Sequence, residues 1–182
     1  LGSATRSFFT GGRTPSILNR IDYIDSSSTG NFSDFGDLTA ARRIAGACGN
    51  RTQGHTAGGV PSLNSIEKIT YATIGNAVDF GDLTGTHSSH GSTQANSPTR
   101  GLFAGGGTDV IEFIEFSSSG GATDFGDMSE QHNQPGNVSS TTRACFGGGT
   151  LGGAPYLNTK IDTVQIGTLG NAVDFGDLTA AV

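Results

Sequence analysis

The pentapeptide Asp34-Phe35-Gly36-Asp37-Leu38 returns three times along the chain, and the rest of the sequence is organised around it. Its copies stand at 79–83, 124–128 and 174–178, and the copy at 124–128 ends in methionine instead of leucine. The phenylalanines are spaced 45, 45 and 50 residues apart, and a fixed period of about 20 to 50 residues is typical of repeat architectures. Asp-Phe-Gly also occurs in protein kinases, but there it stands once, beside a glycine-rich loop and a catalytic loop that this chain lacks. The period therefore predicts four copies of one structural unit.

Each unit is expected to contain four short strands separated by turn signals. The first strand runs into a double glycine, at 6–12, 51–59, 100–107 and 143–149. The second carries an Ile-acid pair, at 19–24, 64–69, 109–114 and 158–164. The third is the repeated pentapeptide, and the fourth is the variable stretch after it, at 39–50, 84–99, 129–142 and 179–182. Short apolar runs bounded by Gly, Ser and Asn are typical of β-strands and their turns.

The second strand of each unit predicts sheets that are buried on both faces. Ile66 and Ile69 lie three positions apart, so in a strand they point to opposite faces, and a sheet with two apolar faces is covered on both sides. Glu67 in the same strand then lies on a buried face and needs a partner, because an unpaired buried charge is strongly destabilising.

The expected partner of this acid is an arginine that recurs once per unit, because its planar fork suits a carboxylate. The arginines are Arg6, Arg51, Arg100 and Arg143, and the acids are Asp22, Glu67, Glu112 and Asp162. A calcium site at Asp-x-x-Asp is the alternative, but calcium takes about six to eight oxygen ligands and these motifs lie on predicted strands.

The fourth unit lacks most of its variable stretch, and a matching stretch stands at the other end of the chain. Residues 1–5 lead into Arg6 as residues 46–50 lead into Arg51. Laid end to end, 179–182 and 1–5 make a strand of nearly normal length, so we expect the two termini to meet in space. Four-stranded sheets buried on both faces, with one sheet shared between the chain ends, describe a β-propeller.

The predicted fold is therefore all-β, a single four-bladed β-propeller domain over 1–182 with four antiparallel strands per blade. The blades are expected at approximately 1–38, 39–83, 84–128 and 129–178, and residues 179–182 join the N-terminal strand to close the last blade with both termini.

The order of the strands resembles the kelch repeat over the whole chain. The Phe of the pentapeptide stands where kelch blades usually carry Trp, after a strand with Asn-x-Ile-Asp/Glu and a strand ending in Gly-Gly. The sequence pattern Gly-Asn-Ala-x-Asp-Phe-Gly-Asp-Leu, at 75–83 and 170–178, is also similar to repeat proteins that phages encode in tail-fibre-like contexts. Kelch propellers usually have six or seven blades, so four blades are either a small closed ring or an arc of a larger one.

Composition narrows the classes of partner. The net charge of −6 comes without any run of Lys or Arg, which argues against a nucleic-acid surface. No apolar run approaches the roughly 18 residues that a membrane helix needs, so membrane insertion is not expected. Cys48 and Cys145 stand at unmatched positions of different units and predict two free, buried thiols rather than a disulfide framework.

Positions that differ between units are better candidates for a binding site than positions that build every unit. Seven residues after each repeated Phe stand Arg42, His87, His132 and Val182. The innermost strand of a propeller lines its central channel, so we expect this set to form a polar ring at one channel mouth. Tyr156, in the longest loop after a double glycine, is the best-placed aromatic residue. The predicted ligand-binding residues are Arg42, Arg43, His87, His90, Gln131, His132, Asn133 and Tyr156.

Two other interpretations of this polar ring stay open. It is either a water-lined channel satisfied by backbone groups, or a zinc or nickel site formed by His87, His90 and His132, although no metal-binding spacing supports the metal. We expect no cofactor, no metal and no catalytic residue, because the abundant serines have no matched His and acid and Cys145 lies on a predicted strand.

The resulting hypothesis is a non-catalytic recognition module that binds glycan or another cell-surface ligand as part of a phage-type fibre or adhesin, outside the cell or on a virion surface. A protein–protein interaction scaffold of the kelch type is the alternative, and an enzyme on a propeller is the third. A homo-oligomer or a place in a larger fibre is the expected assembly, because a weak surface binder gains from avidity.

Overall fold

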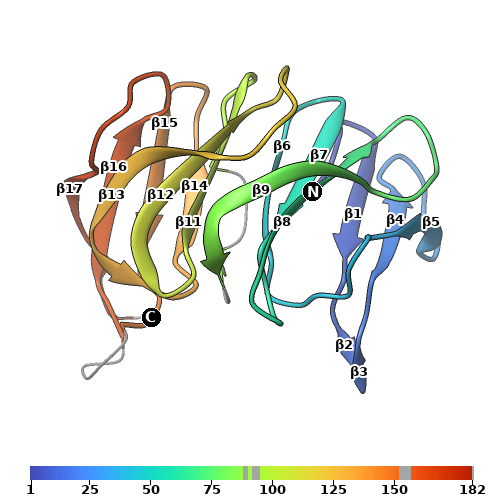
Figure 1. The fold of residues 1–182 in the computed structure, drawn as a ribbon, viewed down its shortest axis with the longest axis horizontal. Helices are drawn as coiled ribbons and strands as arrows, with labels where there is room; N and C mark the ends of the chain where they lie inside the picture. The colour runs from blue at the N-terminus through green and yellow to red at the C-terminus, as the bar shows by residue number, and fades with distance from the viewer. Residues whose placement is uncertain (88–89, 92–94, 152–156, 182) are drawn as a thin grey trace.

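The protein is all-β, and a computed structural model describes residues 1–87, 90–91, 95–151 and 157–181. Most of its strands form four antiparallel sheets of three or four strands. The sheets follow one another in chain order and stand side by side, from blue to red in Figure 1. Each sheet corresponds to one sequence repeat, so we refer to them as units 1 to 4.

Units 2 to 4 share one order of four strands, and unit 1 has the same order with three strands instead of the expected four. Unit 1 contains β1 (Arg6–Thr10), β4 (Arg20–Asp25) and β5 (Ser33–Asp37), and unit 2 contains β6 (Gly46–Gly49), β7 (Gln53–Ala57), β8 (Leu63–Thr70) and β9 (Val78–His87). Unit 3 contains β10 (His90–Gly91), β11 (Arg100–Gly105), β12 (Thr108–Glu115) and β13 (Thr123–His132), and unit 4 contains β14 (Gly136–Ser139), β15 (Arg143–Gly147), β16 (Lys160–Gln165) and β17 (Val173–Asp177). The short hairpin of β2 (Arg13–Thr14) and β3 (Ser16–Ile17) extends from unit 1.

The second predicted strand is buried on both faces in units 2 and 3, as its pattern of isoleucines indicates. In β8, Ile66 and Ile69 are both buried although they point to opposite faces. A shift of register between Ile66 and Glu67 marks a bulge where β8 pairs with the pentapeptide strand β9, and the same irregularity recurs in the other three sheets.

In the part of the chain that the structure describes, the hydrophobic core consists of three clusters, one between each pair of neighbouring sheets. The cluster between units 1 and 2 includes Phe35 and Leu38 of the first pentapeptide together with Ile69 and Tyr71 of unit 2. The other two clusters contain Phe80 and Phe125 in the same role. The repeated pentapeptide therefore faces the next sheet in the series and holds two units together.

The two ends of the chain lie at different sheets. Gly2 bridges to Ser7 beside β1, so the N-terminal segment extends the sheet of unit 1. Residues 179–181 form no strand, and the C-terminus lies beside unit 4, on the opposite side of the molecule from unit 1 (Figure 1). Among the described residues, 179–181 and 1–5 form no common strand, and the closure of the last sheet by both ends of the chain stays a prediction.

Candidate functional site

The predicted ring of Arg42, His87 and His132 is buried between units and does not line an open channel. Each of the three residues follows a pentapeptide in the chain and reaches into the next unit, so they occupy equivalent places at the three successive junctions. The sequence had shown that they are equivalent, and the structure places them in the interior between units.

Arg42 is paired with the acid that the sequence left in need of a partner. Its guanidinium forms an ion pair with Glu67 in which both side chains are fully buried. The same guanidinium donates to the carbonyls of Gly58 (3.0 Å) and Ser65 (3.1 Å). Glu67 also accepts a hydrogen bond from the backbone N–H of Thr39 (2.6 Å). The ion pair and these hydrogen bonds together offset the free-energy cost of burying two charges.

His87 and Glu112 are the corresponding pair between units 2 and 3. His87 Nε2 lies 3.5 Å from Glu112 Oε2, and the backbone N–H of Thr84 donates to Glu112 Oε1 (2.6 Å). Burial raises the pKa of the Glu112 carboxyl, but the hydrogen bonds from His87 and Thr84 outweigh burial and hold this pKa below its ordinary value. Glu112 is therefore an anion at neutral pH.

His132 closes the third junction without contacting an acid directly. Its Nδ1 lies 2.7 Å from the carbonyl oxygen of Gly148, and its Nε2 lies 3.4 Å from Asn158 Nδ2. His87 and His132 thus belong to different junctions, and the described residues contain no group of three or more His, Cys, Asp or Glu side chains that could hold a metal ion.

The other predicted binding residues are scattered. Arg43 pairs through its backbone with Val60, Asn133 pairs in the same way with Thr150, and exposed Gln131 donates to the Gly107 carbonyl. His90 lies in β10, but its side chain is outside the described structure, and so is Tyr156.

The recurring arginines do not pair with the recurring acids, which corrects the sequence-based expectation. Arg6 donates to the Tyr71 carbonyl in the next unit (2.8 Å), and Arg100 donates likewise to the Ile166 carbonyl (3.1 Å). Arg51 is out of register with them, because the partner of Thr70 in β7 is Gln53. Gln53 Nε2 donates to the Phe116 carbonyl (2.6 Å) and takes the arginine's role at that junction.

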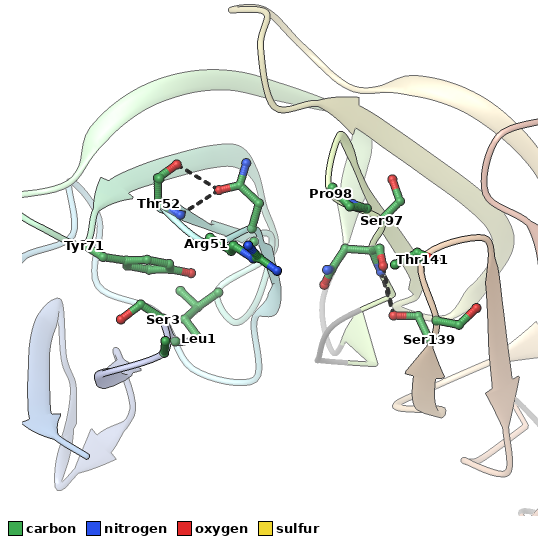
Figure 2. A pocket seen from close by; sticks show the side chains of 15 residues that line it. Leu1, Ser3, Arg51, Thr52, Tyr71, Ser97, Pro98, Ser139 and Thr141 are labelled. Carbon is green, nitrogen blue, oxygen red and sulfur yellow. Dashed lines mark hydrogen bonds between the residues drawn. The ribbon is translucent and has the colours of Figure 1, made fainter. Parts of the chain in front are cut away.

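The structure contains a basin that the sequence-based reasoning missed. A cavity of ≈ 800 Å³ lies where the turns that precede β1, β7, β11 and β15 come together. Figure 2 shows Leu1, Ser3, Thr52 and Tyr71 on one side and Ser97, Pro98, Ser139 and Thr141 on the other, with the Arg51 side chain extending into the space between them.

The four turns around the basin share one hydrogen-bonding design. In each, a Ser or Asn side chain accepts a hydrogen bond from the backbone N–H three residues later, at 3.0 to 3.1 Å. The accepting residues are Ser3, Asn50, Ser97 and Ser140. Such local side-chain bonds hold a turn in one shape.

The sequence signal for these turns is the pattern Ser/Asn-x-Thr-Arg/Gln, which occurs at 3–6, 50–53, 97–100 and 140–143. Three of its four positions are nearly constant, and the remaining position is Ala4, Arg51, Pro98 or Thr141. All four of these variable residues line the basin. The basin is therefore a repeated framework that presents a different side chain from each unit.

The walls of the basin are hydrogen-bonded between units. The Ser139 hydroxyl accepts from the backbone N–H of Asn96 (3.1 Å) and donates to the Asn96 carbonyl (3.1 Å), which ties unit 4 to unit 3 (Figure 2). On the opposite wall, Tyr71 is almost fully buried against Phe8 of unit 1, with ring centroids 4.8 Å apart.

Both cysteines are free thiols, as the sequence predicted, but only Cys48 is fully buried, and Cys145 is half-buried. Burial raises the pKa of the Cys48 thiol, so it stays protonated at neutral pH. No helix in the described part of the chain is long and apolar enough to cross a membrane.

A scan of protein-family models found none that matches this chain, and a search of curated proteins found no match either.

Proposed function

We propose that the chain is a non-catalytic recognition module of kelch-like β-propeller type, with four sheets as blades, that binds glycan in the basin formed by the four turns. The serial arrangement of antiparallel sheets, each packed face to face on the next, supports the propeller architecture. The observation that carries the binding proposal is the position of the variable turn residues, because all four face one cavity.

The chemistry of the basin fits a sugar. Its lining is rich in hydroxyl and amide groups, including Ser3, Asn50, Ser97 and Thr141, and such groups hydrogen-bond sugar hydroxyls in both directions. A cavity of ≈ 800 Å³ lies within the range of about 300 to 1,000 Å³ that small-ligand sites occupy. Tyr71 is the one aromatic residue among the described residues of the lining, so we expect binding to rest on hydrogen bonds rather than on stacking.

Among the described residues that line the basin, Arg51 has the one charged side chain. A guanidinium presents several donors in a fixed plane and matches a carboxylate with two parallel hydrogen bonds. Sugars that carry a carboxylate are therefore expected to bind more tightly than neutral sugars of the same size, and this preference should weaken as salt is added.

The setting we propose is a phage-type fibre or an adhesin at a virion or cell surface, which the similarity of the repeats to tail-fibre-like proteins favours. A single hydrogen-bonding site of this kind binds weakly, and clustering on a fibre multiplies the apparent affinity. Protein–protein scaffolding is the second candidate, and the exposed aromatic residues at the two ends of the series favour association with protein.

A glycan array with dense display and matched acidic and neutral sugars tests the proposal. Binding by the wild-type chain should fall at least about tenfold in Arg51→Ala, which corresponds to about 1.4 kcal/mol, and should disappear in Thr141→Trp, which fills the basin. Arg13→Ala is the matched control, because Arg13 is an exposed arginine on the β2–β3 hairpin. Failure of the folded protein to bind any sugar, or equal loss in the control, would contradict the proposal.

A further inference from the structure

The three junctions between consecutive units are built from the same backbone hydrogen bonds. At the first junction, the Phe35 carbonyl accepts from Gly75 N (2.9 Å), and the Asp37 carbonyl accepts from Ala77 N (2.8 Å). The N–H of Asp37 in turn donates to Asn76 Oδ1 (3.0 Å). The pentapeptide strand of one unit thus binds the Gly-Asn-Ala turn of the next.

The second and third junctions repeat this arrangement. At the second, Gly120 N donates to the Phe80 carbonyl (3.0 Å) and Ala122 N to the Asp82 carbonyl (2.7 Å); at the third, Gly170 N donates to the Phe125 carbonyl (2.8 Å) and Ala172 N to the Asp127 carbonyl (2.7 Å). We call the pentapeptide side of a unit its tail face and the turn side its head face.

A second layer of contacts also recurs at every junction. The residue after the pentapeptide donates its backbone N–H to the buried acid of the next unit, in the pairs Thr39 and Glu67, Thr84 and Glu112, and Ser129 and Asp162. The first residue of β1, β7 and β11 donates to a backbone carbonyl of the next unit, in the pairs Arg6 and Tyr71, Gln53 and Phe116, and Arg100 and Ile166.

The tail face of unit 4 has every element of this junction but no partner among the described residues. Phe175 is 57% exposed, whereas Phe35, Phe80 and Phe125 are at most 5% exposed. A Cβ on Gly176 would meet nothing within 4 Å. The hydroxyl-bearing residue after the pentapeptide is Thr179, and Arg143 holds the place of Arg6 and Arg100 in β15.

The head face of unit 1 is the matching half. Gly30-Asn31-Phe32 stands where unit 2 has Gly75-Asn76-Ala77, and Phe32 is 50% exposed. Phe9 is 60% exposed, whereas its register equivalents in units 3 and 4, Phe103 and Phe146, are at most 2% exposed. The Phe9 and Phe32 rings contact each other edge to face, 4.9 Å apart, and form one exposed apolar patch.

The recurring acid of unit 1 is also more exposed than its equivalents in the other units. Asp22 is the equivalent of Glu67, Glu112 and Asp162, which are buried, but its side chain is 30% exposed and pairs with Arg20 of its own unit. The partly exposed carboxylate of Asp22 on the head face can accept a hydrogen bond, and the backbone N–H of Thr179 on the tail face can donate one. The two faces are therefore complementary.

We propose that the tail face of one copy of this chain binds the head face of a second copy through a fourth junction of the same design. The expected bonds run from Gly30 N to the Phe175 carbonyl and from Phe32 N to the Asp177 carbonyl. Those of the second layer run from Thr179 N to Asp22 and from Arg143 to the Ser26 carbonyl. Continuity with the three internal junctions identifies the occupant, because each of them already shows a head face seated on a tail face.

This contact is heterologous, since two different faces meet. Two copies close into a ring if their rotation allows, and otherwise the contact propagates into an open filament. In either case each copy uses both of its end faces. The inference does not rest on the glycan-binding proposal, because the basin and the end faces are separate surfaces.

Light scattering coupled to size exclusion, across a range of protein concentrations, tests the inference with two single variants. Phe175→Asp blocks the tail face and Phe32→Asp blocks the head face, and both side chains are exposed, so folding is retained, as circular dichroism checks. Wild-type protein should be a dimer or larger, and each variant alone should be a monomer. A mixture of the two variants should form a dimer again, because one intact tail and one intact head remain.

Matched controls place the same charge one residue or two residues away. The control variants are Val173→Asp and Ser33→Asp, and both positions are exposed. The equivalent residue in unit 2 is Val78, which stays 53% exposed although its unit takes part in internal junctions. Both control variants should therefore assemble as the wild type does. A monomeric wild type at every concentration would overturn the proposal. The proposal would also be overturned if only one of the two blocking variants disrupted the assembly, or if the mixture of the two variants stayed monomeric.

Discussion

The guanidinium of Arg42 and the carboxylate of Glu67 form an ion pair that is fully buried between two sheets. The pair joins residues from consecutive repeats, and the same two positions hold His87 and Glu112 at the following junction. A polar contact at the centre of an apolar interface fixes how one sheet is seated on the next, because any other seating leaves a buried charge unpaired.

Removal of one partner of this pair should be strongly destabilising. Arg42→Met leaves the Glu67 carboxylate buried without its cation, which should lower the free energy of unfolding by about 3 to 5 kcal/mol. The double variant Arg42→Met/Glu67→Gln should recover much of this loss, because the neutral amide oxygen still accepts from Thr39 N. Urea unfolding at pH 7 measures both effects. A loss below about 1 kcal/mol in the single variant would show that the pair contributes little.

Acid should destabilise the protein through His55. This ring is fully buried, 4.5 Å from Phe80 and stacked on Phe116 at 5.2 Å between centroids. Burial, with a smaller contribution from the charge of Lys68, lowers the pKa of His55 to about 4 from an ordinary 6.5. The unfolded chain therefore binds a proton between pH 6.5 and pH 4 that the folded chain excludes, so stability falls as pH falls through this range and the loss is complete below pH 4.

Replacement of this ring isolates the effect. Unfolding by urea at pH 7 and at pH 4.5 should show a loss of stability in the wild type that exceeds the loss in His55→Leu by about 2 kcal/mol. Leucine is the matched substitution because Leu102 occupies the equivalent position in unit 3. Equal losses in the two proteins would show that burial does not lower the pKa of His55.

The close approach of two backbones at each junction should make the pentapeptide glycine intolerant of a side chain. A Cβ on Gly81 would lie 2.4 Å from the carbonyl carbon of Gly120, and its φ of +142° adds backbone strain. Gly120 has a similar φ of +137°, but a Cβ there meets nothing within 4 Å. Thermal or urea unfolding of Gly81→Ala should therefore show about 1 to 3 kcal/mol more loss than Gly120→Ala. Equal losses would mean that strain, not proximity, explains the glycine.

The sequence predicted the sheets well because their signals are local and repeated. The pentapeptide, the double glycine and the isoleucine spacing each occur once per unit, and most of the long strands lie where a signal stands. The need of Glu67 for a partner was also evident from the sequence, because the residue shares a strand with Ile66 and Ile69. The identity of the partner was not, since Arg42 belongs to another unit and lies 25 residues away.

The candidate site was harder to predict for a physical reason. Strands β9 and β13 run on past the pentapeptide to His87 and His132, so the variable residues there cover the next sheet instead of starting an inner strand. The turns around the basin carried a signal in Ser/Asn-x-Thr-Arg/Gln, but its variable position gains meaning only when four turns from distant parts of the chain come together.

Chemical-shift mapping of backbone amides with a sugar that the array identifies would test the central claim most directly. The account predicts that the perturbed amides cluster in the four turns around 3–5, 50–52, 97–99 and 140–142, and that Arg51→Ala reduces the shifts while Arg13→Ala leaves them unchanged. Shifts confined to the buried junctions near Arg42, His87 and His132, or shifts scattered over the surface, would contradict a binding site in the basin.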